Sequence, residues 1–488
     1  MKATRLKRSR ISRKTHKILD EERDPLTSFP EPLLHHILSY LTMRDVIRTS
    51  VLSKRWRYTW MYVPCLNFPP IKMSRYKEKN FINQSLLLHK GPAIQKFSLA
   101  FPYPSEDERF PHVDSWIYFA KTRNVKELYL DFSDSGGLHL YHYSCHNDFY
   151  RLPPLLFSLT SLTFLSLVKC EIHFPVKFKL SSLKRLSLKQ VNFSGGQIND
   201  LRDSTPILES LSLSNCQVCV DLDVYMDGWS TVKALKIDES VQKSSDSALT
   251  ISAGHIASFE LITSMPRGFY FVPQRMKSLE RASFKCDKGC CRCGRYEVAK
   301  ENMVFEILDN VRHAKYLSVC CCYVQALCRK EELSRNRLHF DATCLAIRTN
   351  LSNGELPGIG YMLRHSPNIE TLIINIDFQL NNNLEDGGYW KLQEPNFVNL
   401  LCNLKEVRIN NFMKNQRLVE SAPLQKDMDF LRFLLKHSKA MERMAITTYK
   451  KANIGRNSEN KRSKLLFQLS QELLAFPRAS QAAQISLN

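Results

Sequence analysis

The sequence predicts a mixed α/β chain: a module of three short helices, then a long and irregular array of strand repeats, then a C-terminal cap. Three observations support this prediction. Apolar residues recur at helical spacing between residues 28 and 63, strand-like segments then return every 21 to 25 residues, and strand and helix signals alternate again after residue 395. With 488 residues the chain is too long for one compact core, which also favours an elongated array.

Residues 1–23 form a basic tail that contributes to a formal net charge of +21. Such a block is typical of a disordered tail, and it can also act as a nuclear-import address; both alternatives stay open. We therefore expect the protein in the nucleus, in the cytoplasm or in both. Eight basic residues precede Asp20 with no acid among them: Lys2, Arg5, Lys7, Arg8, Arg10, Arg13, Lys14 and Lys17.

The composition argues against secreted and membrane proteins. The charged start is followed by no apolar run of the kind a secretory signal needs, and nowhere do about 18 consecutive apolar residues occur. The 15 cysteines are a small share of the chain and several are adjacent, which is typical of free thiols in a reducing compartment. We expect a soluble, intracellular protein without a membrane partner.

Residues 24–68 are predicted to form the helical module. A first helix of about three turns is expected over residues 28–41, with prolines only near its start, and Thr42 followed by Asp45 predicts the start of a second. Ser53 opens a third. The apolar positions at helical spacing are Leu33, Leu34, Ile37, Leu38 and Leu41 in the first helix, and Trp56, Trp60 and Val63 in the third.

A module of this size is expected to leave apolar surface for a partner. Trp56 and Trp60 are the natural anchors for such a contact. The alternative is that both rings simply fill the module's own core.

Three segments of this module, residues 29–38, 42–46 and 50–57, resemble an F-box of the plant type. Phe29 stands where the family usually has leucine, and Pro32 where it usually has glutamate. The resemblance implies docking on a Skp-type adaptor that connects to a cullin scaffold and a ubiquitin-conjugating enzyme. By position it also implies adaptor contact, or immediate support of it, by Pro30, Leu33, Ile37, Leu38, Val46, Leu52 and Trp56.

Residues 95–375 contain pairs of apolar residues two positions apart. From Leu165 the first members of successive pairs differ by 21, 25, 24 and 24 residues, the period of leucine-rich repeats, which form a solenoid of strands and return segments. After Leu261 the spacing loosens to 35, 28 and 27, which indicates insertions. The pairs are Leu128/Leu130, Leu165/Leu167, Leu186/Leu188, Leu211/Leu213, Leu235/Ile237, Phe259/Leu261, Ala282/Phe284, Leu317/Val319, Leu345/Ile347 and Leu372/Ile374.

The longest insertion contains the one hint of a metal. Cys290 and Cys293 have the spacing of a zinc-binding pair, Cys286 could add a third ligand, and a second pair, Cys216 and Cys219, lies about three repeats away. The alternative is a reduced, cysteine-rich loop, and we expect no metal and no cofactor. The run 320–322 is expected to be a strand whose thiols pack as small apolar side chains.

Residues 395–488 read as a strand from Asn403, a helix over 427–438, a strand from Ala440 and a final segment over 465–478. The order resembles the FBD region that closes many plant F-box/leucine-rich-repeat proteins. Physically, it would act as a cap on the last repeat.

No catalytic constellation is found, and Gly358 and Gly360 read as turn residues. We therefore expect a non-enzymatic substrate receptor of an SCF-type (Skp adaptor, cullin, F-box) ubiquitin ligase with an unknown protein target. The first alternative is a repeat-based binding module outside ubiquitination; nucleic acid is its candidate ligand, although basic and aromatic residues do not cluster along the sequence. The second is a metal-dependent enzyme built on Cys286 to Cys293.

Overall fold

The structure, a computed structural model, divides the chain into two compact units, residues 1–207 and 208–488, which are described separately. The basic tail and the run from Cys290 to Cys293 lie outside the described residues, as does Cys219, so the predictions for them stay predictions. The described residues are 29–70, 74–101, 111–133, 149–175, 178–193, 200–218, 222–225, 229–239, 248–263, 268–271, 276–286, 299–330, 338–377, 388–397, 400–412, 422–448 and 456–487.

The first unit begins with the predicted helical module, but its helices are shorter than expected. Helix α2 (Glu31–Leu38) has about two turns, because it starts only after Pro30. Helix α3 (Met43–Arg48) starts as predicted, with the Thr42 side chain accepting a hydrogen bond from the Asp45 N–H at 3.3 Å. After the short 3-10 turn η2 (Thr49–Val51), the predicted third helix is present in shortened form as the single helical turn α4 (Trp56–Thr59) followed by the 3-10 turn η3 (Trp60–Tyr62).

The parallel ladder of the first unit starts inside the range assigned to the helical module. Val63 is extended rather than helical, and it leads into strand β1 (Cys65–Phe68), which the sequence analysis missed. The ladder continues in the order β2 (Lys96–Ala100), β3 (Glu127–Asp131), β5 (Phe164–Val168) and β7 (Arg185–Lys189).

The segments between these strands form helices and a second, short sheet. The helices are α5 (Arg75–Leu88), α6 (Pro111–Thr122), η4 (Pro154–Ser158) and α7 (Asp200–Ser204). The second sheet pairs β4 (Tyr150–Arg151), β6 (Cys170–Ile172) and β8 (Asn192–Phe193) in parallel.

The second unit repeats the same plan, with ten of its described strands in the parallel ladder. They are β9 (Ser210–Ser214), β12 (Ala234–Glu239), β14 (Ser258–Thr263), β16 (Arg281–Cys286), β17 (Tyr316–Val319), β18 (Cys344–Thr349), β19 (Thr371–Ile376), β20 (Glu406–Phe412), β21 (Arg443–Thr448) and β22 (Gln484–Leu487). Strands β20 to β22 belong to the expected cap, and they continue the ladder in parallel register instead of merely covering its end.

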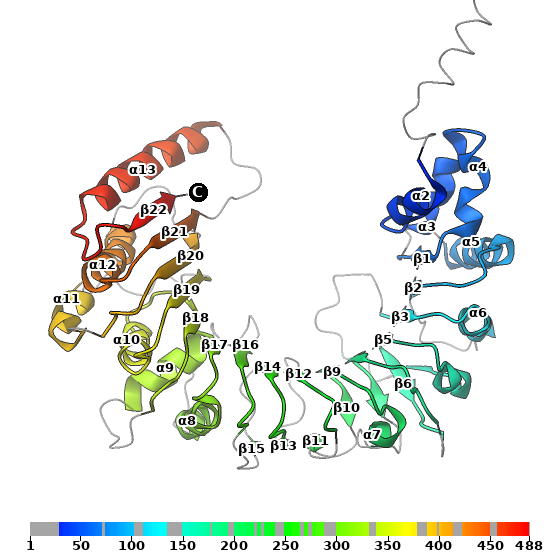
Figure 1. Ribbon diagram of the computed structural model, residues 1–488, viewed down its shortest axis with the longest axis horizontal. Coiled ribbons are helices and arrows are strands. Elements are labelled where there is room, and N and C mark those ends of the chain that lie inside the picture. Colours follow the sequence, from blue (N-terminus) through cyan, green and yellow to red (C-terminus); the bar gives the residue numbers. More distant parts are fainter. Residues whose placement is uncertain are drawn as a thin grey trace, which may run out of the picture. The chain divides into compact units, whose positions relative to one another are not determined.

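The return segments of this unit change character along the chain. After β10 (Gln217–Val218), a short sheet of β11 (Leu222–Tyr225), β13 (Ala248–Ser252) and β15 (Gly268–Phe271) accompanies the first strands. Helices then take over on the same side of the ladder (Figure 1). They are α8 (Ala299–Val311), α9 (Cys321–Lys330), α10 (Leu356–Arg364), α11 (Tyr389–Gln393), η6 (Glu394–Phe397), α12 (Ala422–His437) and α13 (Arg456–Ala475).

The predicted apolar pairs all lie in ladder strands and form the core. In the first unit, for example, Leu128 is in register with Leu165 and Leu165 with Leu186, and all three are buried. The second unit has an equivalent row, in which each member stands beside the equivalent residue of the next strand. The alternation of apolar and polar residues therefore fixes the register, because a shift by one residue would expose the whole row.

Two local predictions for the second unit are wrong. Cys321 and Cys322 do not continue a strand, because α9 begins at Cys321 directly after β17. Gly358 and Gly360 are not turn residues but lie inside α10. Among the described residues, no helix is both long enough and apolar enough to cross a bilayer.

Candidate functional site

Helix α2 carries two apolar stripes that meet different environments. Leu34 and Leu38, four residues apart, are both fully buried and close the core of the module. Leu33 and Ile37 have the same spacing but keep 42% and 38% of their surface exposed. Residues four apart lie on one face of a helix, so Leu33 and Ile37 form a continuous outer stripe.

A second exposed apolar segment follows α3. Val51 is 85% exposed and Leu52 is 59% exposed. Three residues later, the Arg55 guanidinium donates a hydrogen bond of 2.7 Å to the Phe29 carbonyl, two residues before α2 begins. This bond ties the segment that follows η2 to the residues that precede α2. We call Leu33, Ile37, Val51 and Leu52 the outer apolar surface.

The structure divides the seven residues implied for adaptor contact into two groups. Pro30, Leu33, Ile37 and Leu52 are exposed, whereas Leu38, Val46 and Trp56 are buried. The buried three can therefore only support the surface from within. None of these placements tests adaptor contact itself, which stays a prediction.

Two features of this site differ from expectation. Trp56 and Trp60, only 4% and 7% exposed, fill the module's own core, which favours the alternative given for them over direct contact with a partner. Tyr40, 76% exposed, was not selected, although it stands seven residues after Leu33 and continues the spacing of the outer stripe just beyond the end of α2. The helical spacing that predicted α2 was the signal in the sequence that indicated Tyr40.

His89 holds the helical module against the first strands of the ladder. Its imidazole Nε2–H donates to the Val63 carbonyl at 3.0 Å, while the Arg123 guanidinium donates to the carbonyls of Gly91 and His89 at 2.6 and 3.3 Å. Burial lowers the pKa of His89, and the nearby positive charge of Arg123 adds to that effect. The histidine is therefore neutral in the folded protein at neutral pH.

Polar and aromatic side chains gather on the face of the first unit's ladder that carries the non-buried residues, here called the open face. Lys96, Glu127, Phe164 and Arg185 stand in register on four consecutive strands. The Arg185 guanidinium contacts Glu127 at 3.2 Å and stacks on the Phe164 ring at 4.7 Å, and the Lys96 ammonium lies 4.5 Å from the Tyr129 ring. The structure thus brings together basic and aromatic residues that do not cluster along the sequence.

The open face of the second unit carries paired charges. Glu260 accepts contacts from Lys285 at 2.5 Å and from Lys236 at 3.3 Å. Burial works against the charged carboxylate, but these two lysines outweigh it and lower the pKa of Glu260. The Arg281 guanidinium lies 4.1 Å from the Tyr316 ring, and Arg408 is paired with Glu406 at 2.9 Å. Both units therefore present mixed charge and aromatic rings on this face.

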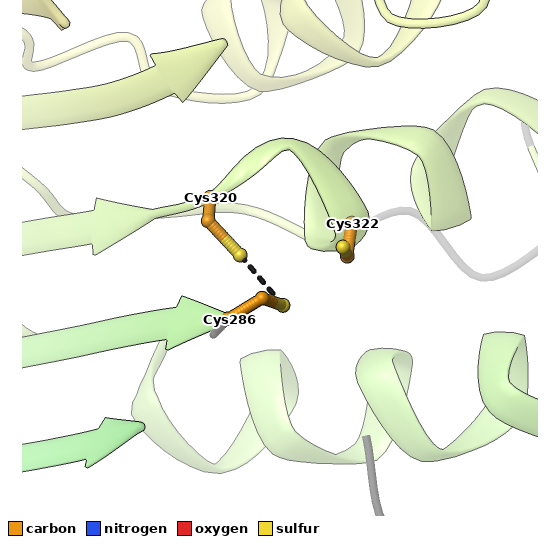
Figure 2. A group of neighbouring side chains, drawn as sticks. All are labelled: Cys286, Cys320 and Cys322. Carbon is orange, nitrogen blue, oxygen red and sulfur yellow. Dashed lines mark hydrogen bonds between the residues drawn. The ribbon is translucent and has the colours of Figure 1, made fainter. Parts of the chain in front are cut away.

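A cluster of thiols lies within the second unit (Figure 2). Cys286 ends β16, Cys320 follows β17 and Cys322 lies in the first turn of α9. The Cys320 thiol donates to the sulfur of Cys286 at 2.9 Å. Burial opposes ionisation of Cys320, but its hydrogen bonds with the side chains of Cys286, Cys321 and Cys322 and with the Cys322 backbone hold its pKa well below the usual value.

These features define a class of protein: a helical module with an exposed apolar surface, joined to a parallel ladder of leucine-rich repeats whose open face carries polar and aromatic side chains. Comparison with known families agrees with both parts. An F-box domain profile matches residues 26–67, and a profile described as the At1g61320/AtMIF1 LRR domain matches residues 86–320.

Related proteins from Arabidopsis thaliana identify the family. The chain is 30% identical over 363 residues to an F-box protein, At1g49610, covering 73% of this chain and 85% of that one. It is 24% identical to the F-box/LRR-repeat protein At5g02910, covering 87% and 88% of the two chains, and 34% identical to the F-box/FBD/LRR-repeat protein At1g13570 over 40% and 45%. The chain belongs to the F-box/leucine-rich-repeat family.

Proposed function

We propose that this protein is the substrate-recognition subunit of an SCF-type ubiquitin ligase. The outer apolar surface of the module docks on a Skp-type adaptor, and the open face of the ladder holds a protein target. The single observation that carries the proposal is the outer stripe of α2. Its inner stripe already closes the module's core, so Leu33 and Ile37 are exposed for a reason other than folding.

The energetics of the surface suit a docking contact. Fully burying a leucine or isoleucine side chain is worth roughly 1.5–3 kcal/mol, and only the exposed part of that can still be gained on binding. With 42% and 38% exposure, Leu33 and Ile37 can contribute about 1 kcal/mol each, and Leu52, at 59%, somewhat more. A few such residues at the centre of an interface commonly supply most of its affinity.

The open face of the ladder suits a protein target better than nucleic acid. Glu127 lies in the same row as Lys96, Phe164 and Arg185, and it is paired with Arg185. A phosphate backbone would meet this carboxylate as a like charge, whereas a protein surface offers groups of both signs and apolar side chains for the rings. The nucleic-acid alternative is therefore not favoured by this surface.

In the proposed mechanism, this protein promotes ubiquitin transfer by binding an adaptor and a target at the same time. An adaptor bound to the module and a target bound to the ladder are joined by one chain, so the target is presented to the ubiquitin-transfer machinery at high effective concentration. The chemistry of transfer then belongs to the partner proteins, and this chain contributes position alone.

We infer that residues 395–488 correspond to the FBD-type region. The order of β20, α12, β21, α13 and β22 supports this assignment. In this role the region extends the ladder by three strands and ends it at β22, which pairs only with β21 among the described strands. A closing segment of this kind protects the last edge of a repeat array.

The adaptor contact is tested by co-purification of the full chain with a Skp-type adaptor and a cullin. The variant Leu33→Ala/Ile37→Ala is expected to lose at least ten-fold in adaptor capture, because about 2 kcal/mol of burial is removed. Leu87→Ala is the matched control: Leu87 is 83% exposed on α5, outside the outer apolar surface. Trp56 is left intact, since replacing a buried ring would unfold the module and obscure the result.

Equal capture by the wild type and the double variant would contradict the proposed docking surface. Absence of capture by the wild-type chain would contradict the ligase role itself. Phe164→Ala distinguishes the adaptor contact from the target contact. It removes an aromatic ring from the open face of the ladder and should leave adaptor capture unchanged.

A further inference from the structure

The three thiols of Cys286, Cys320 and Cys322 converge on one point inside the second unit. Their sulfur atoms all lie within 4.8 Å of one another. The side chains come from separate places, the end of strand β16 and the start of helix α9 (Figure 2), and they are only 6%, 1% and 6% exposed. Among the described residues, no other group of three potential metal ligands converges in this way.

Packing alone does not account for this arrangement. Buried cysteines often act as small apolar side chains, and Cys170 and Cys216 are fully buried without belonging to such a group. The 2.9 Å between the sulfurs of Cys320 and Cys286 is closer than the 3.5–4.0 Å typical of apolar contacts. Thiols are also weak hydrogen-bonding groups, so three of them gain little from one another.

The dimensions match a metal bound by thiolates. At a metal–sulfur distance of about 2.3 Å, ligand sulfurs lie about 3.8 Å apart in a tetrahedral site and about 4.0 Å apart in a trigonal one. The separations here fall within 4.8 Å, and the shortest, 2.9 Å, needs to open by about 1 Å. Each cysteine can make that adjustment by rotating about a single side-chain bond.

The start of α9 also suits a cluster of negative sulfurs. Cys320 immediately precedes the helix and Cys322 lies in its first turn, where backbone N–H groups carry partial positive charge. Three thiolates with no cation would be costly to bury. A metal ion would neutralise them, and the helix terminus would offset the remaining charge.

We propose that Cys286, Cys320 and Cys322 bind one thiophilic metal ion, either Zn²⁺ or Cu⁺. This site differs from the pair formed by Cys290 and Cys293, and it shares only Cys286 with that run of cysteines. Soft thiolate ligands select such ions over the harder cations that carboxylates prefer. The chemistry of the ligands is common to both ions, so separate titrations distinguish them.

The site would hold together the two ends of a long insertion in the second unit. Cys286 and Cys320 are 34 residues apart in sequence, and they flank the segment that contains α8. A metal that closes a long loop restricts the unfolded chain and adds its binding free energy to folding. The metal is therefore structural: it sets how β16 and α9 are held together.

The test uses the full chain, freed of metal with a chelator and kept reduced by a phosphine without oxygen. Zn²⁺ and Cu⁺ are added in separate titrations against a chromophoric competitor, and the bound metal is counted by mass spectrometry. One equivalent of one of these ions is expected in the wild type. Cys320→Ser and Cys322→Ser should each reduce its affinity at least ten-fold. Cys216→Ser, a buried thiol outside the cluster, should retain it.

The variant Cys290→Ser/Cys293→Ser separates this site from the alternative in the cysteine-rich run. It should still bind one equivalent. A second measurement needs no variant: bound metal should protect Cys286, Cys320 and Cys322 of the wild type from alkylation, as mapped by peptide mass spectrometry. The proposal is overturned if the reduced wild type binds neither ion, if binding is lost with Cys290 and Cys293 instead, or if alkylation of the three thiols is unaffected by metal.

Discussion

Gly358 is the position at which one added methyl group should have the largest effect on the second unit. It lies in the first turn of α10, where that helix passes the backbone of α9. A Cβ atom at this position would stand 2.0 Å from the Val324 carbonyl oxygen and 2.9 Å from the Val324 Cγ1. We therefore predict that Gly358→Ala destabilises the unit, although alanine is the better helix former.

The size of the effect follows from the contact. Ordinary van der Waals contact begins at 3.4 Å, so α10 would have to move by 1.4 Å, the difference between 3.4 and 2.0 Å. The obstacle is a backbone carbonyl, which cannot rotate away as a side chain can. A 2.0 Å approach to a backbone atom places this position at the upper end of the 1–3 kcal/mol that overpacking typically costs, and separating the fully buried Ile359 and Met362 from their neighbours adds about 1 kcal/mol. After the gain of about 1 kcal/mol in helix propensity, a net loss of about 2–3 kcal/mol remains.

Urea unfolding followed by circular dichroism measures this loss. With a slope of about 2–3 kcal/mol per molar urea, the midpoint of the transition should fall by about 1 M. Gly354→Ala is the matched control, since a Cβ there meets nothing within 4 Å, and its midpoint should be unchanged or slightly higher. The same midpoint for both variants would refute the close approach of α10 to α9.

Three further predictions concern the folded state. Burial lowers the pKa of His89 below its ordinary 6.5. The contribution of neutral His89 to the free energy of unfolding is therefore fully present above pH 6.5 and declines as the pH falls below it. His89→Gln should flatten this pH dependence in urea midpoints measured from pH 7.5 to 5.5. Leu34→Ala should cost about 2–5 kcal/mol in urea unfolding, because the side chain is fully buried, whereas Val51→Ala, at 85% exposure, should change stability by less than about 0.5 kcal/mol. Glu355→Ala should cost about 3 kcal/mol in the same assay, because the buried carboxylate accepts hydrogen bonds from the Thr349 hydroxyl at 2.6 Å and the Asn350 N–H at 2.7 Å; equal stability would contradict that role.

The ladder could be predicted in detail because its signal is local and repeated. Each apolar pair alternates with polar residues, and that alternation alone decides which side chains enter the core. Pairs such as Leu186/Leu188 and Leu345/Ile347 therefore marked their strands directly, even where insertions made the spacing irregular. Strand β1 was missed, because its short segment follows directly after the helical module.

The helical module was predicted less completely, because the first helix is apolar on two sides. Leu33 and Leu34 are adjacent and chemically identical, yet one is 42% exposed and the other is fully buried. Tertiary packing decides which stripe faces inward, and helical spacing contains no information about it. The same limit explains why Trp56 was expected to reach a partner: large apolar residues suit a core and an interface equally well.

The open face could not have been found from the sequence, and the reason bears on how such proteins change partners. Lys96, Glu127, Phe164 and Arg185 are separated by 31, 37 and 21 residues, and only strand register places them in one row. The return segments between them differ in length and structure without disturbing that row, because the buried leucines on the opposite side of each strand hold it in place. Residues of the open face can therefore be exchanged at little cost to the core, whereas in the proposed function the outer apolar surface must keep its shape for the adaptor. With that function, a chain built this way can acquire a new target while it keeps the same adaptor.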